Sequence, residues 1–199
     1  MTLEWNHNTY HHRLLLTLLP PRRGAALDVG CGDGSFASAL GRLFSRVVAI
    51  DRDAAQVVVA SACCSHLSHV YVVRTDFLTS GFADCEFDVV TALALFHHMP
   101  FADAAREARR LLKPGGRLIV LGVLADRGPR ALPLNLVSIV VNWFLRLRWG
   151  PDKMSAPATL ERTSWGEVKA AAAENLPEAS LRRRLLFRYT LVWDKPGSA

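Results

Sequence analysis

The sequence has few of the residues that build cross-linked or metal-bound folds. Among its 199 residues only four are cysteines: Cys31, Cys63, Cys64 and Cys85. Cys63 and Cys64 are adjacent and cannot readily pair with each other, and no spacing among the four matches a zinc ligand set. We therefore expect reduced thiols, most of them buried, and no metal site.

Long apolar runs are also missing. The longest candidate, residues 132–147, is interrupted by four polar side chains, those of Asn135, Ser138, Asn142 and Arg146. No segment therefore resembles a membrane span. The segment Met1–Trp5 shows no basic stretch followed by an apolar one, so no signal peptide is expected. These observations predict a cytoplasmic protein with no membrane partner.

Lysine is scarce, although the formal net charge is +6 and the isoelectric point is near 9.5. A basic protein suggests phosphate binding when its charges cluster on one face. The two clusters here are Arg106, Arg109 and Arg110, and Arg182, Arg183 and Arg184. Neither is interleaved with aromatic side chains on which bases could stack, so we expect solvated faces rather than a nucleic-acid site.

The order of local patterns predicts one α/β domain. Half of the residues are hydrophobic, and neither an internal repeat nor a low-complexity linker divides the chain. Strand and helix patterns alternate, which favours a mostly parallel sheet covered on both faces. The predicted strands are 25–29, 46–50, 69–73, 87–91 and 117–123, and the predicted helices are 9–19, 35–44, 53–63 and 100–112.

Beyond residue 123 the pattern changes. Residues 134–148 and 164–175 are predicted helices, and residues 181–193 are predicted as strand, with a tight turn near Phe187 as a second interpretation. The helix 134–148 has one polar stripe at spacings of three and four, and the rest of its circumference is apolar. This apolar arc has to be buried against the core and a hydrophobic substrate, a second subunit or a membrane.

Of these three partners, the core with its substrate is favoured, and a homodimer contact stays open. A membrane-lying helix should show a broad cationic face, and this one offers only Arg146 and Arg148. The favoured interpretation makes Val140, Trp143 and Phe144 walls of an apolar acceptor pocket.

The clearest chemical signal is the segment from Asp28 to Gly34, which follows the first predicted strand. Its glycines, Gly30, Gly32 and Gly34, stand on alternate positions. Residues without a β-carbon let a ligand approach the main chain, and the N–H groups that open the next helix then face that ligand. The sequence therefore predicts a ligand-binding strand–loop–helix unit.

The carboxylates near this loop indicate which kind of ligand it binds. Asp51 ends the second strand, where a carboxylate can accept hydrogen bonds from both hydroxyls of a ribose. Asp53 is better placed to cap the following helix. The glycines follow G-x-G-x-G rather than the dinucleotide pattern G-x-G-x-x-G, and Asp28 and Asp33 lie beside them. Such a loop suits a ligand with an ammonium and a sulfonium better than a pyrophosphate.

Five motifs in order resemble the class I S-adenosylmethionine-dependent methyltransferases, and within them the bacterial subgroup that acts on small molecules. Residues 27–34 resemble motif I, and Asp51 matches the ribose-binding acid. Asp76 and Phe77 match the acid and aromatic residue at the adenine. Residues 87–99 and 111–118 resemble the fourth-strand motif and the turn before the fifth strand. Together the motifs span about residues 24–123.

The resemblance implies a Rossmann-like α/β sandwich with a seven-stranded sheet in the order 3-2-1-4-5-7-6, the seventh strand antiparallel. It divides residues 1–199 into an N-terminal helical lid (1–23), a cofactor-binding core (24–123), a cap insertion over the acceptor site (124–160) and a final helix with strands (161–199). The leading Trp5, Asn8, Tyr10 and His11 resemble a lid pattern. Tyr10 is then a candidate contact for the cofactor's carboxylate, and a packed aromatic role stays open.

The resemblance also implies S-adenosylmethionine as cofactor and S-adenosylhomocysteine as product. The implied cofactor contacts are Tyr10, Asp28, Gly30, Cys31, Gly32, Gly34, Asp51, Arg52, Asp76, Phe77, Ala92 and Leu93. The motif Asn-Pro-Pro-Tyr or Asp-Pro-Pro-Tyr is absent after the fourth strand, which argues against methylation of a nucleobase or a glutamine amide.

His97 and His98 are the candidate catalytic residues. They follow the fourth strand, at the sheet edge where ligands of open α/β sheets bind. An imidazole can take a proton from a hydroxyl or amine nucleophile. The expected reaction is methyl transfer to an O, N or C atom of a small lipophilic molecule. A cofactor-binding regulator without methyl transfer, and an enzyme of this fold with other chemistry, stay as alternatives.

Overall fold

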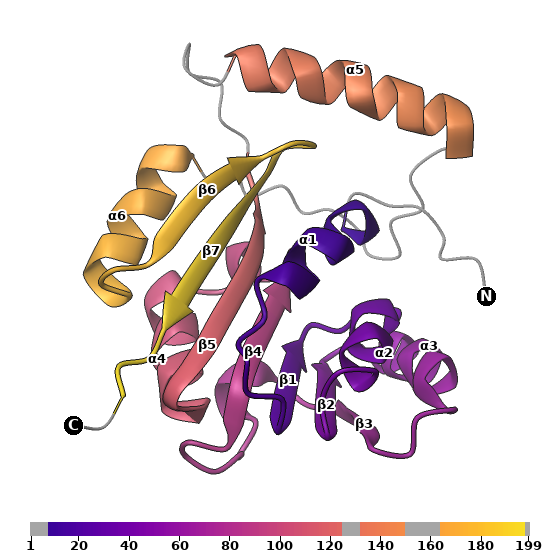
Figure 1. Ribbon diagram of the computed structural model, residues 1–199, viewed down its shortest axis with the longest axis vertical. Helices are drawn as coiled ribbons and strands as arrows, with labels where there is room; N and C mark the ends of the chain where they lie inside the picture. The colour runs from indigo at the N-terminus through magenta and orange to yellow at the C-terminus, as the bar shows by residue number, and fades with distance from the viewer. Residues whose placement is uncertain (1–7, 125–131, 150–163, 198–199) are drawn as a thin grey trace.

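The computed structural model describes residues 8–124, 132–149 and 164–197. Its centre is a seven-stranded sheet in the order β3-β2-β1-β4-β5-β7-β6 (Figure 1). This is the order that the resemblance implied, and that prediction is confirmed. The strands are β1 (Ala25–Val29), β2 (Arg46–Asp51), β3 (Val70–Arg74), β4 (Phe87–Leu93), β5 (Leu112–Val123), β6 (Ser180–Arg184) and β7 (Arg188–Asp194).

The first five strands pair in parallel, and β7 runs antiparallel to both β5 and β6. Every residue of β1 is buried, and so are the first six of β4. Strands that are covered on both faces have near-continuous apolar sequences, which is the pattern seen in these segments. Because β1, β4 and β5 run parallel, their carboxyl ends lie at one common edge of the sheet.

Helices cover both faces of this sheet. The helical segments are η1 (Thr9–His11), α1 (His12–Thr17), α2 (Ser35–Gly41), α3 (Ala54–Cys64), η2 (Phe77–Thr79), η3 (Phe96–His98), α4 (Phe101–Leu111), α5 (Leu132–Trp149) and α6 (Trp165–Asn175). Among the described residues, no helix combines the length and the apolar character needed to cross a bilayer.

Two main apolar cores result from this layering. Buried residues of α4 and α6 pack with Leu27, Val90 and Val120 on one face of the sheet. Those of α1 and α2 pack with residues such as Val89 and Ile119 on the other face. Since neighbouring residues of a strand point to opposite faces, Val89 and Val90 belong to different cores.

Local signals explain where two of the helices begin. The Asp53 side chain accepts a hydrogen bond from the Ala55 N–H and caps α3, as predicted. Ser164 and Glu167 form a capping box at the start of α6. The predicted tight turn lies between β6 and β7, where Leu186 and Phe187 have φ of 59° and 58°.

Several predicted boundaries and one burial prediction are wrong. The first helix is a 3-10 turn followed by α1 and ends at Thr17, and α2 ends at Gly41. β5 begins at Leu112, because the Lys113–Gly116 segment is an excursion within the strand: Leu112 pairs with Phe87 and Arg117 with Val89. All four thiols are free, but Cys63 is half-buried and Cys85 is exposed, so only two of the four are buried.

The orientation of α5 is the opposite of the predicted one. Three members of its polar stripe, Asn135, Ser138 and Asn142, are buried or half-buried, whereas Arg146 is exposed. Ser138 is 1% exposed, and its hydroxyl accepts a hydrogen bond from the Leu186 N–H at 3.0 Å. The apolar arc therefore points outward. α5 lies across the end of the molecule above η1, α1 and the tip of the β6–β7 hairpin (Figure 1).

Candidate functional site

The loop after β1 has the close approaches that its glycines permit. Gly30 and Gly34 have φ of 66° and 76°, in the left-handed region that favours glycine. A β-carbon on Gly34 would lie 2.8 Å from Cα of Ala60 in α3. One on Gly30 would lie 2.9 Å from Cδ1 of Leu95, just after β4. The loop is thus held between α3 and the end of β4, and Gly34 is the N-cap of α2.

Asp51 joins this loop to the end of β2. Its Oδ2 accepts a hydrogen bond from the Gly32 N–H at 3.0 Å, and its Oδ1 accepts one from the Asp53 N–H at 3.0 Å. A carboxylate has about four acceptor positions, so both oxygens keep capacity for further donors. Asp51 is therefore suited to receive ribose hydroxyls while it fixes the loop.

Asp28 is a second carboxyl group beside the loop, and it is 2% exposed. The Thr91 hydroxyl donates to its Oδ1 at 2.7 Å, because β1 and β4 pair with Asp28 opposite Thr91. Its Oδ2 is buried without a hydrogen-bond partner in the described part of the chain. Burial raises the pKa of Asp28 to about 7. Asp28 therefore holds its proton more tightly than a solvated aspartate, and a cationic group near the loop would favour its ionised form.

The end of β4 approaches the same loop. Ala92 lies opposite Val29 in the sheet register. Two residues later Ala94 has φ of 52°, an uncommon conformation for a residue with a β-carbon, and Leu95 then covers Gly30. The turn at Ala94 brings η3, with His97 and His98, to the edge of the sheet where β1 and β4 end.

His97 and His98 lie together but in different surroundings. Their ring centroids are 4.0 Å apart, and His98 is exposed whereas His97 is half-buried. Nδ1 of His97 is buried and has no hydrogen-bond partner among the described residues. Burial, together with the nearby His98 and Arg188, lowers the pKa of His97 to about 4. His97 is therefore neutral at pH 7 and can accept a hydrogen bond, and the same low pKa makes it a weaker base than a solvated imidazole.

Three further predicted contacts lie after β2 and β3. Asp76 is exposed and accepts a hydrogen bond from the Leu78 N–H at 2.9 Å, which caps η2. Phe77 is 4% exposed and packs within the core beneath α4. Arg52 is exposed, and its carbonyl accepts a hydrogen bond from the Arg74 Nε at 3.3 Å. An adenine contact for Asp76 and Phe77 stays a prediction.

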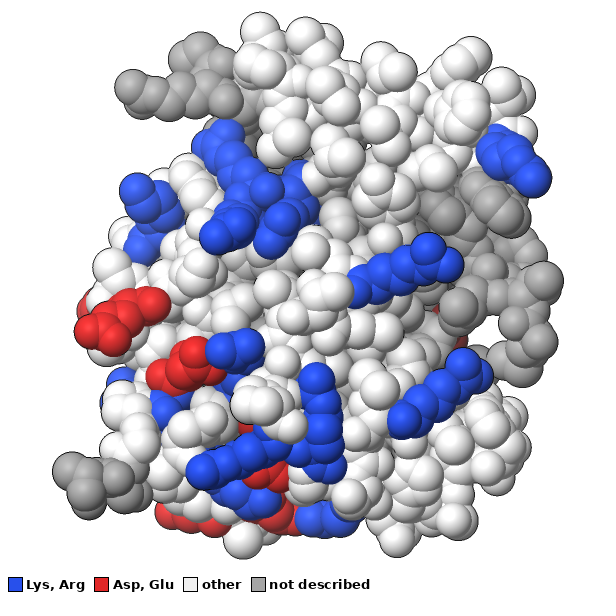
Figure 2. All heavy atoms as spheres, in the orientation of Figure 1, with Lys and Arg blue, Asp and Glu red and all other residues white. Residues whose placement is uncertain are grey.

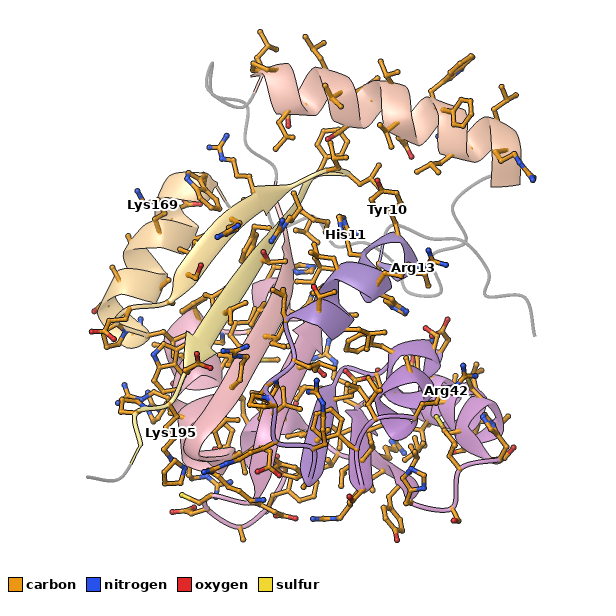
Figure 3. All side chains as sticks on the ribbon, in the orientation of Figure 1. Tyr10, His11, Arg13, Arg42, Lys169 and Lys195 are labelled. Carbon is orange, nitrogen blue, oxygen red and sulfur yellow. The ribbon has the colours of Figure 1, made fainter. Side chains whose placement is uncertain are left out.

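The N-terminal segment lies under α5, against the β6–β7 hairpin. Figure 3 shows Tyr10 and His11 between α1 and α5. Nε2 of His11 lies 3.1 Å from the Leu185 carbonyl oxygen, and Asn8 Oδ1 accepts from the Arg188 guanidinium at 3.3 Å. Tyr10 is 39% exposed and packs edge-on to His11. Trp5, also part of the predicted lid pattern, lies outside the described residues.

The three predicted pocket-wall residues do not reach this site. Val140, Trp143 and Phe144 are 64%, 65% and 61% exposed on the outward side of α5. The pocket assignment is therefore wrong, because the helix is anchored by Ser138 with its polar stripe inward. Residues 125–131 and 150–163, which make up the rest of the predicted cap, lie outside the described residues.

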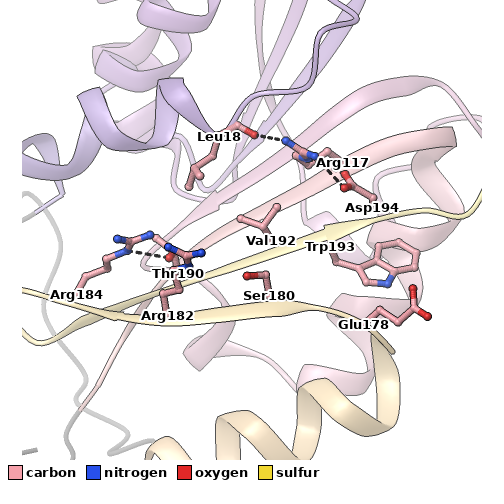
Figure 4. Close-up of a pocket in the computed structure, with 10 residues that line it drawn as sticks. All are labelled: Leu18, Arg117, Glu178, Ser180, Arg182, Arg184, Thr190, Val192, Trp193 and Asp194. Atoms are coloured by element: carbon pink, nitrogen blue, oxygen red, sulfur yellow. Dashed lines mark hydrogen bonds and ion pairs between the residues drawn. The ribbon is translucent and has the colours of Figure 1, made fainter.

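A separate hollow of about 420 Å³ lies on the face of the sheet formed by β5, β7 and β6. Figure 4 shows Arg182, Arg184 and Thr190 on one side of it, and the Arg117–Asp194 ion pair on another. None of the predicted cofactor residues lines it. In the described ranges no group of three His, Cys, Asp or Glu side chains is arranged to hold a metal ion.

Sequence reasoning missed three residues that the fold brings to the site. They are Thr91, which donates to Asp28, Leu95, which covers Gly30, and Arg188, which lies near His97. The parallel pairing of β1 with β4 could have indicated Thr91, because it sets that residue opposite Asp28. Arg188 had no such signal, since its strand is far away in the sequence.

Comparison with known proteins agrees with this geometry. Residues 27–120 match the family model of the methyltransferase domain. An uncharacterized methyltransferase of Mycobacterium tuberculosis is 29% identical over 203 residues, covering 98% of this chain and 100% of that protein. A ubiquinone biosynthesis O-methyltransferase of Xanthomonas oryzae is 35% identical over 118 residues, covering 56% of this chain and 47% of that protein.

A solved structure shows the same fold. The geranyl diphosphate C-methyltransferase of Streptomyces coelicolor, determined with Mg²⁺, geranyl diphosphate and S-adenosyl-L-homocysteine, superposes with a TM-score of 0.66. It is 15% identical, and the alignment covers 94% of this chain and 77% of that chain.

Proposed function

We propose that this chain, in which residues 27–120 match the methyltransferase domain, acts as a class I S-adenosylmethionine-dependent methyltransferase on an O, N or C nucleophile of a small lipophilic molecule. The observation that carries the proposal is the loop after β1 together with two carboxyl groups beside it, those of Asp28 in β1 and Asp51 at the end of β2. Asp51 holds the loop through Gly32, and Asp28 keeps one buried oxygen unpaired beside it. This pair fits a cofactor that has a ribose and two cationic groups.

The residues that would hold the cofactor come from five segments of the chain. The glycine loop with Asp28 and Cys31 would border it, Asp51 and Arg52 would lie at the ribose, Asp76 and Phe77 at the adenine, and Ala92, Leu93 and Tyr10 at the amino-acid end. When bound, S-adenosylmethionine supplies a methyl group that is activated by the sulfonium. The protein then has to align the acceptor and exclude water, and such positioning can lower a barrier by roughly 7–11 kcal/mol.

His97 is the proposed proton acceptor for the nucleophile. It is neutral at pH 7 because burial lowers its pKa to about 4. Its unpaired Nδ1 can receive a hydrogen bond from a hydroxyl or amine. His98 lies against it and can serve the same purpose from a more exposed position.

The names of the similar proteins support a lipophilic acceptor. One is a ubiquinone biosynthesis O-methyltransferase, and another is a geranyl diphosphate C-methyltransferase. Within the proposal, residues 1–23 form a lid and residues 124–160 a cap beside the acceptor.

A direct assay tests the whole proposal. The purified full chain is incubated with methyl-labelled S-adenosylmethionine and a lipid extract as the acceptor pool. The expected result is S-adenosylhomocysteine in equal amount to a lipid-soluble product that carries one additional methyl group. Cofactor binding without turnover on this pool or on a water-soluble extract would instead indicate a regulator, and a product that gains a different part of the cofactor would indicate other chemistry.

A further inference from the structure

The outward side of α5 is an unusually apolar surface. We name it the outer face of α5. Its large apolar side chains are 50% to 72% exposed: Leu132, Leu136, Val137, Ile139, Val140, Trp143, Phe144 and Leu147. Contiguous apolar patches of this kind mark interaction sites rather than ordinary solvated surface.

The way in which α5 is anchored explains why this face stays outside. The Ser138 hydroxyl donates to the Leu134 carbonyl at 2.7 Å and accepts from the Leu186 N–H at 3.0 Å. Rotating the apolar arc inward would expose Ser138 and leave the buried Leu186 N–H without its acceptor, which is costly. The outward orientation therefore belongs to the fold, and the arc stays exposed among the described residues.

The charges around this face have one sign. α5 contains no acidic residue, and its last turn carries Arg146 and Arg148. The contact of Leu186 with Ser138 places the end of β6 beside α5, which brings Arg184 close to the helix. Figure 2 shows basic side chains directly below the band of uncharged side chains that belongs to α5.

Two of the β6 arginines share one side of their strand. Arg182 is exposed and Arg184 half-buried, and both line the hollow on the β5–β7–β6 face (Figure 4). Arg184 donates to the Thr190 hydroxyl at 3.0 Å, and burial together with the charge of Arg182 lowers its pKa. Arg183 points to the opposite face and stacks on Trp165. The pair Arg182 and Arg184 therefore suits an external phosphate group.

We propose that the outer face of α5 docks on an anionic lipid bilayer, with its apolar side chains at the acyl boundary. Arg146, Arg182 and Arg184 then lie at the headgroup phosphates. Helices that lie in a membrane interface combine such an apolar face with flanking cations, and Trp143 is of the type enriched at that depth. From the sequence alone, Arg146 and Arg148 are the only cations available to such a helix, which argues against a membrane. The fold supplies further cations by placing the arginines of β6 near α5.

A second copy of the chain fits this surface less well. Joining two outer faces would bury the apolar arcs but would bring arginines of equal sign together with no acidic residue of α5 to pair them. Like charges across an interface oppose association, whereas anionic headgroups complement them. The charge pattern therefore favours the bilayer.

Docking in this way would serve a lipophilic acceptor. α5 lies over the end of the molecule toward which β4 and β5 run, the same edge that carries His97 (Figure 1). A substrate dissolved in the bilayer would then reach the acceptor side directly. This consequence rests on the proposed function, but the docking itself does not.

Vesicle co-sedimentation tests the docking without cofactor or acceptor. The full chain is mixed with vesicles of phosphatidylcholine alone and of equal parts phosphatidylcholine and phosphatidylglycerol. Binding to the anionic vesicles should be strong and should weaken with salt. Val140→Glu should lower it roughly tenfold or more, and Arg182→Ala with Arg184→Ala roughly fivefold for each arginine lost.

Val58→Glu is the matched control, since Val58 is 70% exposed on α3, away from α5. It should bind vesicles like the wild type. A cooperative thermal unfolding transition, measured without ligand, verifies that each variant is folded. Wild-type protein that stays in the supernatant, or equal binding by Val140→Glu, would overturn the proposal. So would a wild-type dimer that Val140→Glu makes monomeric while neither binds vesicles.

Discussion

Oδ2 of Asp51 accepts a hydrogen bond from the backbone N–H of Gly32 at 3.0 Å, so the end of β2 fixes the conformation of the loop after β1. The same carboxylate is the proposed acceptor for the ribose hydroxyls. Asp51→Ala should therefore weaken S-adenosylhomocysteine binding at least about tenfold, because hydrogen bonds to a charged group contribute roughly 1.5–3 kcal/mol each. Isothermal titration calorimetry measures this directly.

Asp53→Ala is the control for this change. Asp53 caps α3, so the Asp53→Ala variant should lose about 1 kcal/mol of stability with little change in ligand affinity. Undiminished affinity in Asp51→Ala would refute the ribose assignment.

The buried carboxyl of Asp28 should make the protein less stable as pH rises. Its pKa is about 7 in the folded chain, against 3.8 for a freely solvated aspartate side chain. Between these values the unfolded chain releases the proton while the folded chain keeps it, so stability falls as pH rises from about 4 to 7. Asp28→Asn removes this loss. The measurement is the difference in melting temperature between Asp28→Asn and the wild type, both without cofactor. This difference should be several degrees larger at pH 8 than at pH 5, because 1 kcal/mol of stability corresponds to roughly 2–4 °C in melting temperature.

Two histidines make the protein more stable as pH rises, but their effect is the same in the wild type and in Asp28→Asn and so drops out of the comparison. Burial lowers the pKa values of His12 and His97 to about 4 from 6.5, so each adds stability as pH rises from 4 to 6.5. Both are present in the wild type and the variant. An equal difference in melting temperature at the two pH values would mean that Asp28 is ionised in the folded chain already at pH 5.

Replacing His97 should affect turnover more than cofactor binding. If it accepts the proton, His97→Ala should lower kcat about 10²-fold, with cofactor affinity unchanged. The low pKa keeps His97 neutral from pH 6 to 9, so wild-type turnover should show no loss due to His97 in that range and should fall only as pH approaches 4.

His98→Ala tests the second candidate, and His66→Ala is the control because His66 is exposed in the turn after α3. Full turnover of both His97→Ala and His98→Ala across pH 6 to 9 would make the pair structural.

The cofactor half of the molecule was predictable because its signals are local. The glycine loop, Asp51 and the Asp53 cap each depend on a few residues near one strand end, where conformation and chemistry are fixed by neighbours in the sequence. The strand order followed from the resemblance to the family. Contacts between distant segments, such as Arg188 near His97, depend on how β7 enters the sheet, which no local pattern reveals.

The orientation of α5 shows where pattern reasoning fails. Its stripe of polar residues predicts a solvent-facing side, since helices usually bury their apolar arc. Ser138 instead serves a backbone N–H in the turn between β6 and β7, a partner 48 residues away. Periodicity identifies the two faces of a helix but does not say which one the fold buries.

Removing the Ser138 hydroxyl should therefore destabilise the protein and loosen α5. Ser138→Ala leaves the buried Leu186 N–H without its acceptor, which costs about 1–3 kcal/mol. Hydrogen exchange should then speed up at Leu186, and thermal unfolding should begin at a lower temperature. Ser61→Ala is the matched control, because the Ser61 hydroxyl also donates to a carbonyl four residues earlier in its helix but is exposed. Its loss should change stability by no more than about 0.5 kcal/mol. Equal stability of the two variants would show that Ser138 does not anchor α5, and the outward orientation of the apolar face would lose its physical cause.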